Sequence, residues 1–146
     1  MKSLPEGNLD SPFKTAALTV CALCAYAAAP EVGIELLNFL RGPRPLSGYD
    51  EQNLRDRFRG KTYLPFSYFE GATPKNEYKP NEPFKLTVSS DPHSNDQEGY
   101  CKLFIRSGGA DDPRPVVLRR KGEQWFLWEQ LLMSGIRMPA SEDPWA

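Results

Sequence analysis

The stretch PVVLRRKGEQWFLWE, residues 115–129, decides the fold that this sequence predicts. Val116 and Leu118 alternate with neighbours that point to the opposite side, and the aromatic residues that follow also favour an extended chain. Between the two halves, Lys121 and Gly122 are suited to a tight turn, because glycine adopts the positive φ that such turns require. The stretch therefore predicts an antiparallel β-hairpin.

Two earlier stretches predict strands of the same sheet. The sequences FKLTV at residues 84–88 and YCKLFIR at residues 100–106 alternate in a way that is typical of strands. A polar loop at residues 89–99 separates them. Residues 131–138 are suited either to a fifth strand or to a short final helix. We therefore expect a four- to five-stranded antiparallel sheet within residues 84–138.

Three helices are predicted before the sheet, within residues 10–60. Apolar side chains recur at helical spacing over residues 12–29 and 30–41, and a proline opens both segments. A third, shorter helix follows Ser47 and Asp50, whose spacing is typical of a capping box. Glycine follows the second and the third of these helices, as is common at helix ends.

The chain of 146 residues has the length of a single domain with its own hydrophobic core. We expect a loose leader at residues 1–9 and a tail at residues 139–146. Residues 61–83 are rich in proline and aromatic residues, so we expect them to pack onto the domain as an irregular cover. The predicted fold class is α+β, with three N-terminal helices packed on a four- to five-stranded antiparallel sheet. This order is also similar to that of the cone-shaped fold of nuclear-transport-factor-like and ketosteroid-isomerase-like proteins.

The charge composition argues against two classes of partner. Eighteen basic and 19 acidic side chains give a net charge of -1, whereas binding to nucleic acid or to an anionic membrane requires concentrated positive charge. We therefore expect no nucleic acid and no membrane as partners. The one basic run is Arg-Arg-Lys at residues 119–121, with Arg114 nearby, and we interpret it as a solvated turn. The apolar residues 15–29 are too few to span a bilayer and follow acidic residues, which favours a buried helix over an export signal.

The cysteines indicate a cytoplasmic protein. Cys21, Cys24 and Cys101 are an odd number and form no disulfide framework, which favours a reducing compartment. Cys21 and Cys24 match the C-x-x-C pattern, but they lie inside a predicted helix and not at its N-terminus, where the thiol pKa would fall. We interpret them as core thiols.

Sites for catalysis, metals and cofactors are not predicted. His93 is the only histidine, so it would have to be part of any Ser/His/Asp or Cys/His arrangement. Asp91, His93 and Asn95 resemble the first ligands of a calcium loop, but Asp96 replaces its glycine and Lys102 its final glutamate. No phosphate-binding glycine loop follows a strand. The sequence leaves open whether the protein is an enzyme, and it favours a protein without catalytic activity.

Several motif words resemble an uncharacterised family of small bacterial proteins. The most distinctive is SYFEGATPKNEYKP at residues 67–80, which fits the pattern SYFxGATPxNxYxP. The words LFIRSGGA at 103–110, QWFLWE at 124–129 and EDPW at 142–145 are also similar to that family. The resemblance implies a bacterial, cytoplasmic setting. It implies no activity and no site residues.

The remaining functional signal is aromatic. Within the predicted strand at 124–129, Trp125 and Leu127 share one face, and Phe126 and Trp128 share the other. Both faces are apolar, so either the 61–83 segment covers one of them or one face binds a partner. The candidate binding residues are Tyr68, Phe69, Glu70, Tyr78, Trp125 and Trp128.

Three functions follow from these observations. The leading hypothesis is a non-enzymatic binding or protein-interaction module, because aromatic residues are in surplus while a catalytic set is missing. The alternative is a small-molecule-binding or isomerase- or hydrolase-like pocket protein of the cone-shaped fold. The third hypothesis is a homodimer that is completed through the tryptophan strand.

Overall fold

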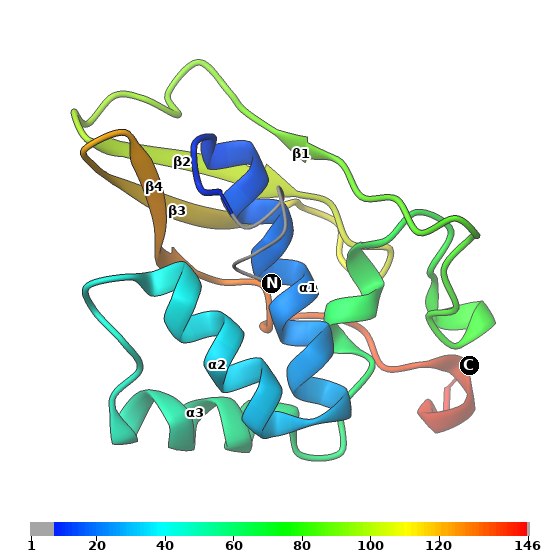
Figure 1. Ribbon diagram of the computed structural model, residues 1–146. Coiled ribbons are helices and arrows are strands. Elements are labelled where there is room, and N and C mark those ends of the chain that lie inside the picture. Colours follow the sequence, from blue (N-terminus) through cyan, green and yellow to red (C-terminus); the bar gives the residue numbers. More distant parts are fainter. Residues whose placement is uncertain (1–7, 146) are drawn as a thin grey trace.

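The computed structural model describes residues 8–145 and contains three helices followed by a four-stranded antiparallel sheet (Figure 1). The helices are α1 (Pro12–Ala28), α2 (Pro30–Arg41) and α3 (Gly48–Phe58). The strands are β1 (Val88–Ser89), β2 (Tyr100–Ile105), β3 (Arg114–Lys121) and β4 (Gln124–Gln130). Three short 3-10 helices are η2 (Leu64–Tyr68), η3 (Pro74–Asn76) and η4 (Ala140–Glu142). The predicted α+β class, with helices before an antiparallel sheet, is confirmed.

The strands follow one another in the order β1-β2-β3-β4. The predicted hairpin joins β3 to β4, and Gly122 in its turn has a φ of 64°. Leu118 lies opposite Leu127, and a register shift between Val117 and Leu118 marks a β-bulge. Strands β1 and β4 form the two edges of the sheet, so β4 has a neighbouring strand on only one side.

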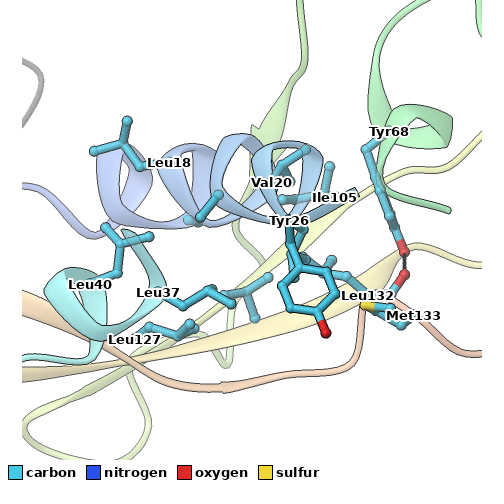
Figure 2. Packing of buried hydrophobic residues seen from close by; sticks show 14 of the residues in the cluster. Leu18, Val20, Tyr26, Leu37, Leu40, Tyr68, Ile105, Leu127, Leu132 and Met133 are labelled. Atoms are coloured by element: carbon cyan, nitrogen blue, oxygen red, sulfur yellow. Dashed lines mark hydrogen bonds between the residues drawn. The ribbon is translucent and has the colours of Figure 1, made fainter. Parts of the chain in front are cut away.

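The inner face of the sheet carries the core. Its side chains are at most 3% exposed, and they are Cys101, Leu103, Ile105, Val116, Leu118 and Leu127. Helix α1 crosses this face, and α2 packs beside α1 and against β4 (Figures 1 and 2). The alternate residues of β2 and β3, such as Tyr100 and Arg119, are half-buried or exposed and form the outer face.

Small residues let α1 approach its neighbours closely. Thr15 is fully buried, and its hydroxyl donates to the carbonyl oxygen of Trp125 at 2.8 Å, which ties α1 to β4. On α2, a Cβ atom at Gly33 would lie 2.3 Å from the Cα of Tyr26, so only glycine permits this helix contact. Among residues 8–145, none of the helices is long and apolar enough to cross a bilayer.

The prediction of a strand at residues 84–88 was wrong for most of its length. Strand β1 contains only Val88 and Ser89. The residues before β1 contact the 61–83 segment instead. The N–H of Glu70 in that segment donates to the carbonyl of Lys85 at 2.7 Å. The Phe84 ring packs on Phe69 with a centroid distance of 5.2 Å.

Residues 131–138 form neither of the predicted elements. They run as an irregular segment after β4, fastened by backbone bonds from Leu131 to Pro115 (3.1 Å) and from Arg137 to Gly109 (2.9 Å). Leu132 fills the core from this segment (Figure 2). The predicted sheet of four to five strands therefore has four, and it ends at Gln130.

Two smaller predictions also change. The expected loose leader covers residues 1–9, of which 1–7 lie outside the described part. Leu9 is buried, and its carbonyl accepts the N–H of Trp125 at 2.7 Å. Of the expected core thiols, Cys21 is exposed and Cys24 is half-buried. Burial, with the neighbouring Cys21 as a smaller cause, raises the pKa of the Cys24 thiol to about 12, which disfavours the reactive thiolate.

Candidate functional site

The six candidate binding residues fall into two separate groups in the structure. Tyr68, Phe69, Glu70 and Tyr78 belong to the 61–83 segment, which lies beside α1 on the green side of Figure 1. Trp125 and Trp128 lie on β4, near the connection between α2 and α3. The two groups therefore do not form one site.

The tyrosines of the first group hold the fold together. Tyr68 is 3% exposed, and its hydroxyl donates to the carbonyl of Leu132 (Figure 2). Tyr78 is 2% exposed and donates to the carbonyl of Arg137. Burial raises the pKa of Tyr68 and raises that of Tyr78 to about 12. Both hydroxyls therefore act as neutral donors to buried carbonyls.

The other two residues of this group border a shallow cleft of 330 Å³. Phe69 is buried against Phe66 and Phe84, with centroid distances of 6.5 and 5.2 Å. Glu70 is exposed, and Arg106 also lines the cleft. One carboxylate and one guanidinium on an open wall define no particular ligand.

In the second group, three side chains surround the ring of Trp128, which is half-buried. The guanidinium carbons of Arg44 and Arg119 lie 3.9 and 4.5 Å from the centroid of this ring. Tyr100 meets the same ring edge-on at 5.8 Å. Arg44 also donates to the carbonyl oxygen of Trp128. Cation–π attraction thus holds two positive charges beside one indole.

The connection after α2 brings Arg44 to this place. Gly42 ends the helix with a φ of 62°, and a Cβ atom there would lie 2.4 Å from the ring of Phe126. Glycine therefore lets the chain lie against β4. Pro43 and Pro45 restrict the backbone on both sides of Arg44. The backbone is consequently restricted at Arg44, and the contacts with Trp128 position the guanidinium.

Two adjoining clefts follow β4, and we call them together the β4 groove. Their volumes are 390 and 650 Å³, and both are lined by Arg41, Arg44, Leu127 and Trp128. The smaller cleft is the basic half, and its further lining residues are Pro43, Arg119, Arg120, Lys121 and Phe126. The larger cleft is mixed in character, with Asp50, Asn53, Glu129, Gln130 and Leu131 among its walls.

Positive charge in the basic half is almost uncompensated. Arg41 pairs with Asp50 at 3.4 Å, while burial and the charge of Arg44 lower the pKa of Arg41. Across residues 8–145, no ion pair joins an acidic side chain to the remaining four cations, which are Arg44, Arg119, Arg120 and Lys121. A recess with this charge focuses a positive potential that attracts anions.

The chemistry of the groove suits carboxylate or phosphate oxygens. A guanidinium that stacks on a ring keeps its N–H donors in its own plane, where they bind an anion in a two-pronged manner. The Arg119 side chain is exposed, and its guanidinium forms no hydrogen bond to another residue of the 8–145 part, so its donors are available to a ligand. Nowhere in that part do three or more His, Cys, Asp or Glu side chains gather as metal ligands.

Sequence reasoning identified only part of this site. It selected Trp125 and Trp128, and it interpreted residues 119–121 as a solvated turn. These residues are exposed, but they form the end of β3 and not the turn, which follows at residues 122–123. Arg119 and Arg120 also lie over Trp128 and Trp125, the latter at 5.8 Å. Arg44 was missed, because no local sequence pattern predicts its contact with Trp128, which lies 84 positions further along the chain.

Two other sequence interpretations are resolved by contacts. Arg114 takes no part in the groove, because it donates to the carbonyls of Ser134 and Gly135, both at 2.9 Å. The 61–83 segment does not supply the cover that we expected over the tryptophan strand. Helices α1 and α2 pack against β4, and arginines lie over its tryptophans.

The chain belongs to a protein family described as a domain of unknown function (DUF6935), which matches residues 1–140. The predicted membership of an uncharacterised family is confirmed to this extent. No curated protein and no solved structure matches the chain.

Proposed function

We propose that this domain is a non-enzymatic binding module of the bacterial cytoplasm, and that the β4 groove binds an acidic segment of a protein partner. The observation that carries the proposal is the half-buried indole of Trp128, flanked by the guanidiniums of Arg44 and Arg119. Tryptophan and arginine are the residues most enriched at binding hot spots. The uncompensated cations around them supply complementarity to carboxylates.

The shape of the groove favours an extended segment over a compact ligand. Its walls include both Lys121 at the start of the hairpin turn and Leu131 beyond the end of β4. Because Lys121 lies opposite Gln124 at the start of β4, these positions span about seven residues, or roughly 23 Å of strand. The net charge of the chain is only -1, so the attraction is local and suits a short acidic segment better than a long polyanion.

A small-molecule ligand is the second candidate. The larger cleft, at 650 Å³, is within the usual size range of small-molecule sites. Of the two acids in its walls, Asp50 and Glu129, the first is engaged in the capping box of α3, and hydrogen bonds from Ser47 lower the pKa of Asp50. A carboxyl of lowered pKa is a poor proton donor near neutral pH, which favours binding over acid catalysis.

The experiment titrates the full chain into a fluorescein-labelled decaglutamate peptide and follows fluorescence anisotropy. We expect binding that weakens as salt rises, because exposed charges are screened. Arg119→Glu should weaken binding by roughly tenfold or more, since it places a like charge against the peptide.

The matched control is Lys75→Glu, which makes the same charge change on an exposed residue of η3, on the side of the molecule away from β4. It should alter the affinity by less than about threefold, because its charge is distant from the peptide. Equal losses in both variants, or no binding by the unaltered chain, would overturn the proposal.

A further inference from the structure

Residues 142–145, with the sequence EDPW, present an acidic and aromatic segment on the surface. Trp145 is 92% exposed, more than any other large hydrophobic side chain among residues 8–145. Neither Glu142 nor Asp143 forms an ion pair with a basic residue in that part of the chain. A solvated tryptophan beside two uncompensated carboxylates is typical of an interface that lacks its partner.

Local contacts hold the segment in this position. The backbone N–H of Ser141 donates to the Glu77 carboxylate at 3.1 Å, and the Ser141 hydroxyl donates to the same group. Glu77 has a φ of 60°, a conformation that residues other than glycine seldom adopt. Past this anchor, the N–H of Trp145 donates to the Asp143 side chain at 2.8 Å, which turns the chain around Pro144. The segment is therefore displayed by a defined turn.

The 142–145 segment and the β4 groove are complementary. The basic half of the groove offers cations without carboxylates and a half-buried indole, whereas the segment offers carboxylates without cations and an exposed indole. We propose that the 142–145 segment of one copy binds in the β4 groove of a second copy. This inference rests on the proposed function, because it assigns the acidic segment that the groove binds.

The segment meets the groove of another copy and not its own. Figure 1 places it at the lower right beside η3, whereas β4 and the α2–α3 connection lie at the left. Ser141 fastens it on that side through Glu77. The contact is therefore head-to-tail, and each copy offers both halves of it. Such contacts close into rings or grow into open chains.

The expected complex pairs each chemical group. The carboxylates of Glu142 and Asp143 face the guanidiniums of Arg44 and Arg119, and the Trp145 indole packs against the aromatic wall that includes Phe126. The turn around Pro144 makes the segment shorter than the roughly 14 Å that four extended residues would reach, so it occupies only the basic half of the groove. So short a contact is smaller than a standard interface, so we expect a Kd in the range of about 10 μM to 1 mM.

A complementation experiment by sedimentation equilibrium tests this inference with the full chain. Arg119→Glu disables the groove and keeps the segment, while the double variant Glu142→Lys/Asp143→Lys does the reverse. The unaltered chain should self-associate at roughly 0.5 mM. Each variant alone should be monomeric, and their equimolar mixture should form a complex of one chain of each.

The control is Glu31→Lys/Glu35→Lys, which makes the same charge change on exposed residues of α2 and should leave self-association intact. Circular dichroism checks that every variant is folded. A monomeric unaltered chain, or a mixture that stays monomeric, would refute the inference. If decaglutamate binds the groove while the unaltered chain stays monomeric, only the self-association fails; if decaglutamate does not bind, the proposed function fails with it.

Discussion

The aromatic residues of the 61–83 segment and those of β4 differ in their surroundings. The rings of Tyr68 and Tyr78 are buried, and their hydroxyls donate to backbone carbonyls. On β4, Trp125 and Trp128 are half-buried, and guanidiniums lie over their rings. The comparison teaches that aromatic content alone does not mark a binding surface. Aromatic residues whose polar groups are buried and bonded stabilise the fold, whereas aromatic residues beside unpaired cations are available to a ligand.

The largest effect should come from removing a buried tyrosine. Tyr68→Ala should lower the free energy of unfolding by about 3–5 kcal/mol, because it leaves a cavity and strands the carbonyl of Leu132. Tyr68→Phe removes only the hydroxyl and should cost about 1–3 kcal/mol. Urea unfolding of both variants measures these losses. A Tyr68→Ala protein of unchanged stability would contradict the view that the buried aromatic residues of the 61–83 segment stabilise the fold.

The next effect concerns the contact between the 61–83 segment and the loop after β2. A Cβ atom at Gly108 would lie 1.9 Å from the carbonyl oxygen of Ala72, so Gly108→Ala should destabilise the fold by about 1–3 kcal/mol. Gly48→Ala is the control, because a Cβ atom there meets nothing within 4 Å. Thermal unfolding of the two variants compares them. If Gly108→Ala loses no more stability than Gly48→Ala, the loop after β2 does not pack tightly against Ala72.

Trp128→Ala should separate stability from binding. The ring is half-buried, so its removal should cost about 1–2 kcal/mol, less than Tyr68→Ala. Decaglutamate binding, measured by anisotropy at a concentration where the variant is fully folded, should nevertheless be lost. The result that contradicts this view is a Trp128→Ala protein that is as unstable as Tyr68→Ala and yet binds normally.

The smallest effect is a pH dependence at the edge of the groove. Hydrogen bonds from Ser47, with smaller contributions from Arg41 and Arg44, lower the pKa of Asp50 in the folded state. Its stabilising effect is therefore present above its unfolded pKa of about 4 and is lost as the pH falls through the lower folded value.

Asp50→Asn should accordingly lower the unfolding free energy by about 0.5–1 kcal/mol at pH 7. The difference from the unaltered chain should shrink as the pH falls below about 4. Denaturant unfolding at several pH values measures it. A difference that grows in acid would mean that the carboxyl is not stabilised as the structure indicates.

The sequence predicted those parts of the fold that depend on local signals. Gly122 marks the hairpin, and Ser47 with Asp50 marks the start of α3 through a capping box that the structure contains. The alternation of apolar and polar residues at 84–88 indicated a strand, but it did not identify the segment that these residues contact. Those residues bond to Glu70, and that choice depends on contacts distant in sequence.

The site was predictable only in part for the same reason. The apolar residues on both faces around Trp128 marked this strand as a candidate binding surface, and the structure adds that β4 is an edge strand. The same reasoning also selected Tyr68 and Tyr78, because a sequence does not tell where a hydroxyl finds its acceptor. Arg44 reaches Trp128 through the turn at Gly42, which only the folded chain reveals.

The central claim is that the β4 groove, and not the 61–83 segment, is the binding surface. A titration of decaglutamate into ¹⁵N-labelled protein tests it most directly, because two-dimensional NMR spectra resolve the indole N–H of each tryptophan and the backbone amides together. We predict that the resonances of the Trp128 indole and of the amides of residues 119–121 shift, while the amide resonances of residues 64–78 do not. Shifts that concentrate in residues 64–78, or a Trp128 indole that does not respond, would contradict it.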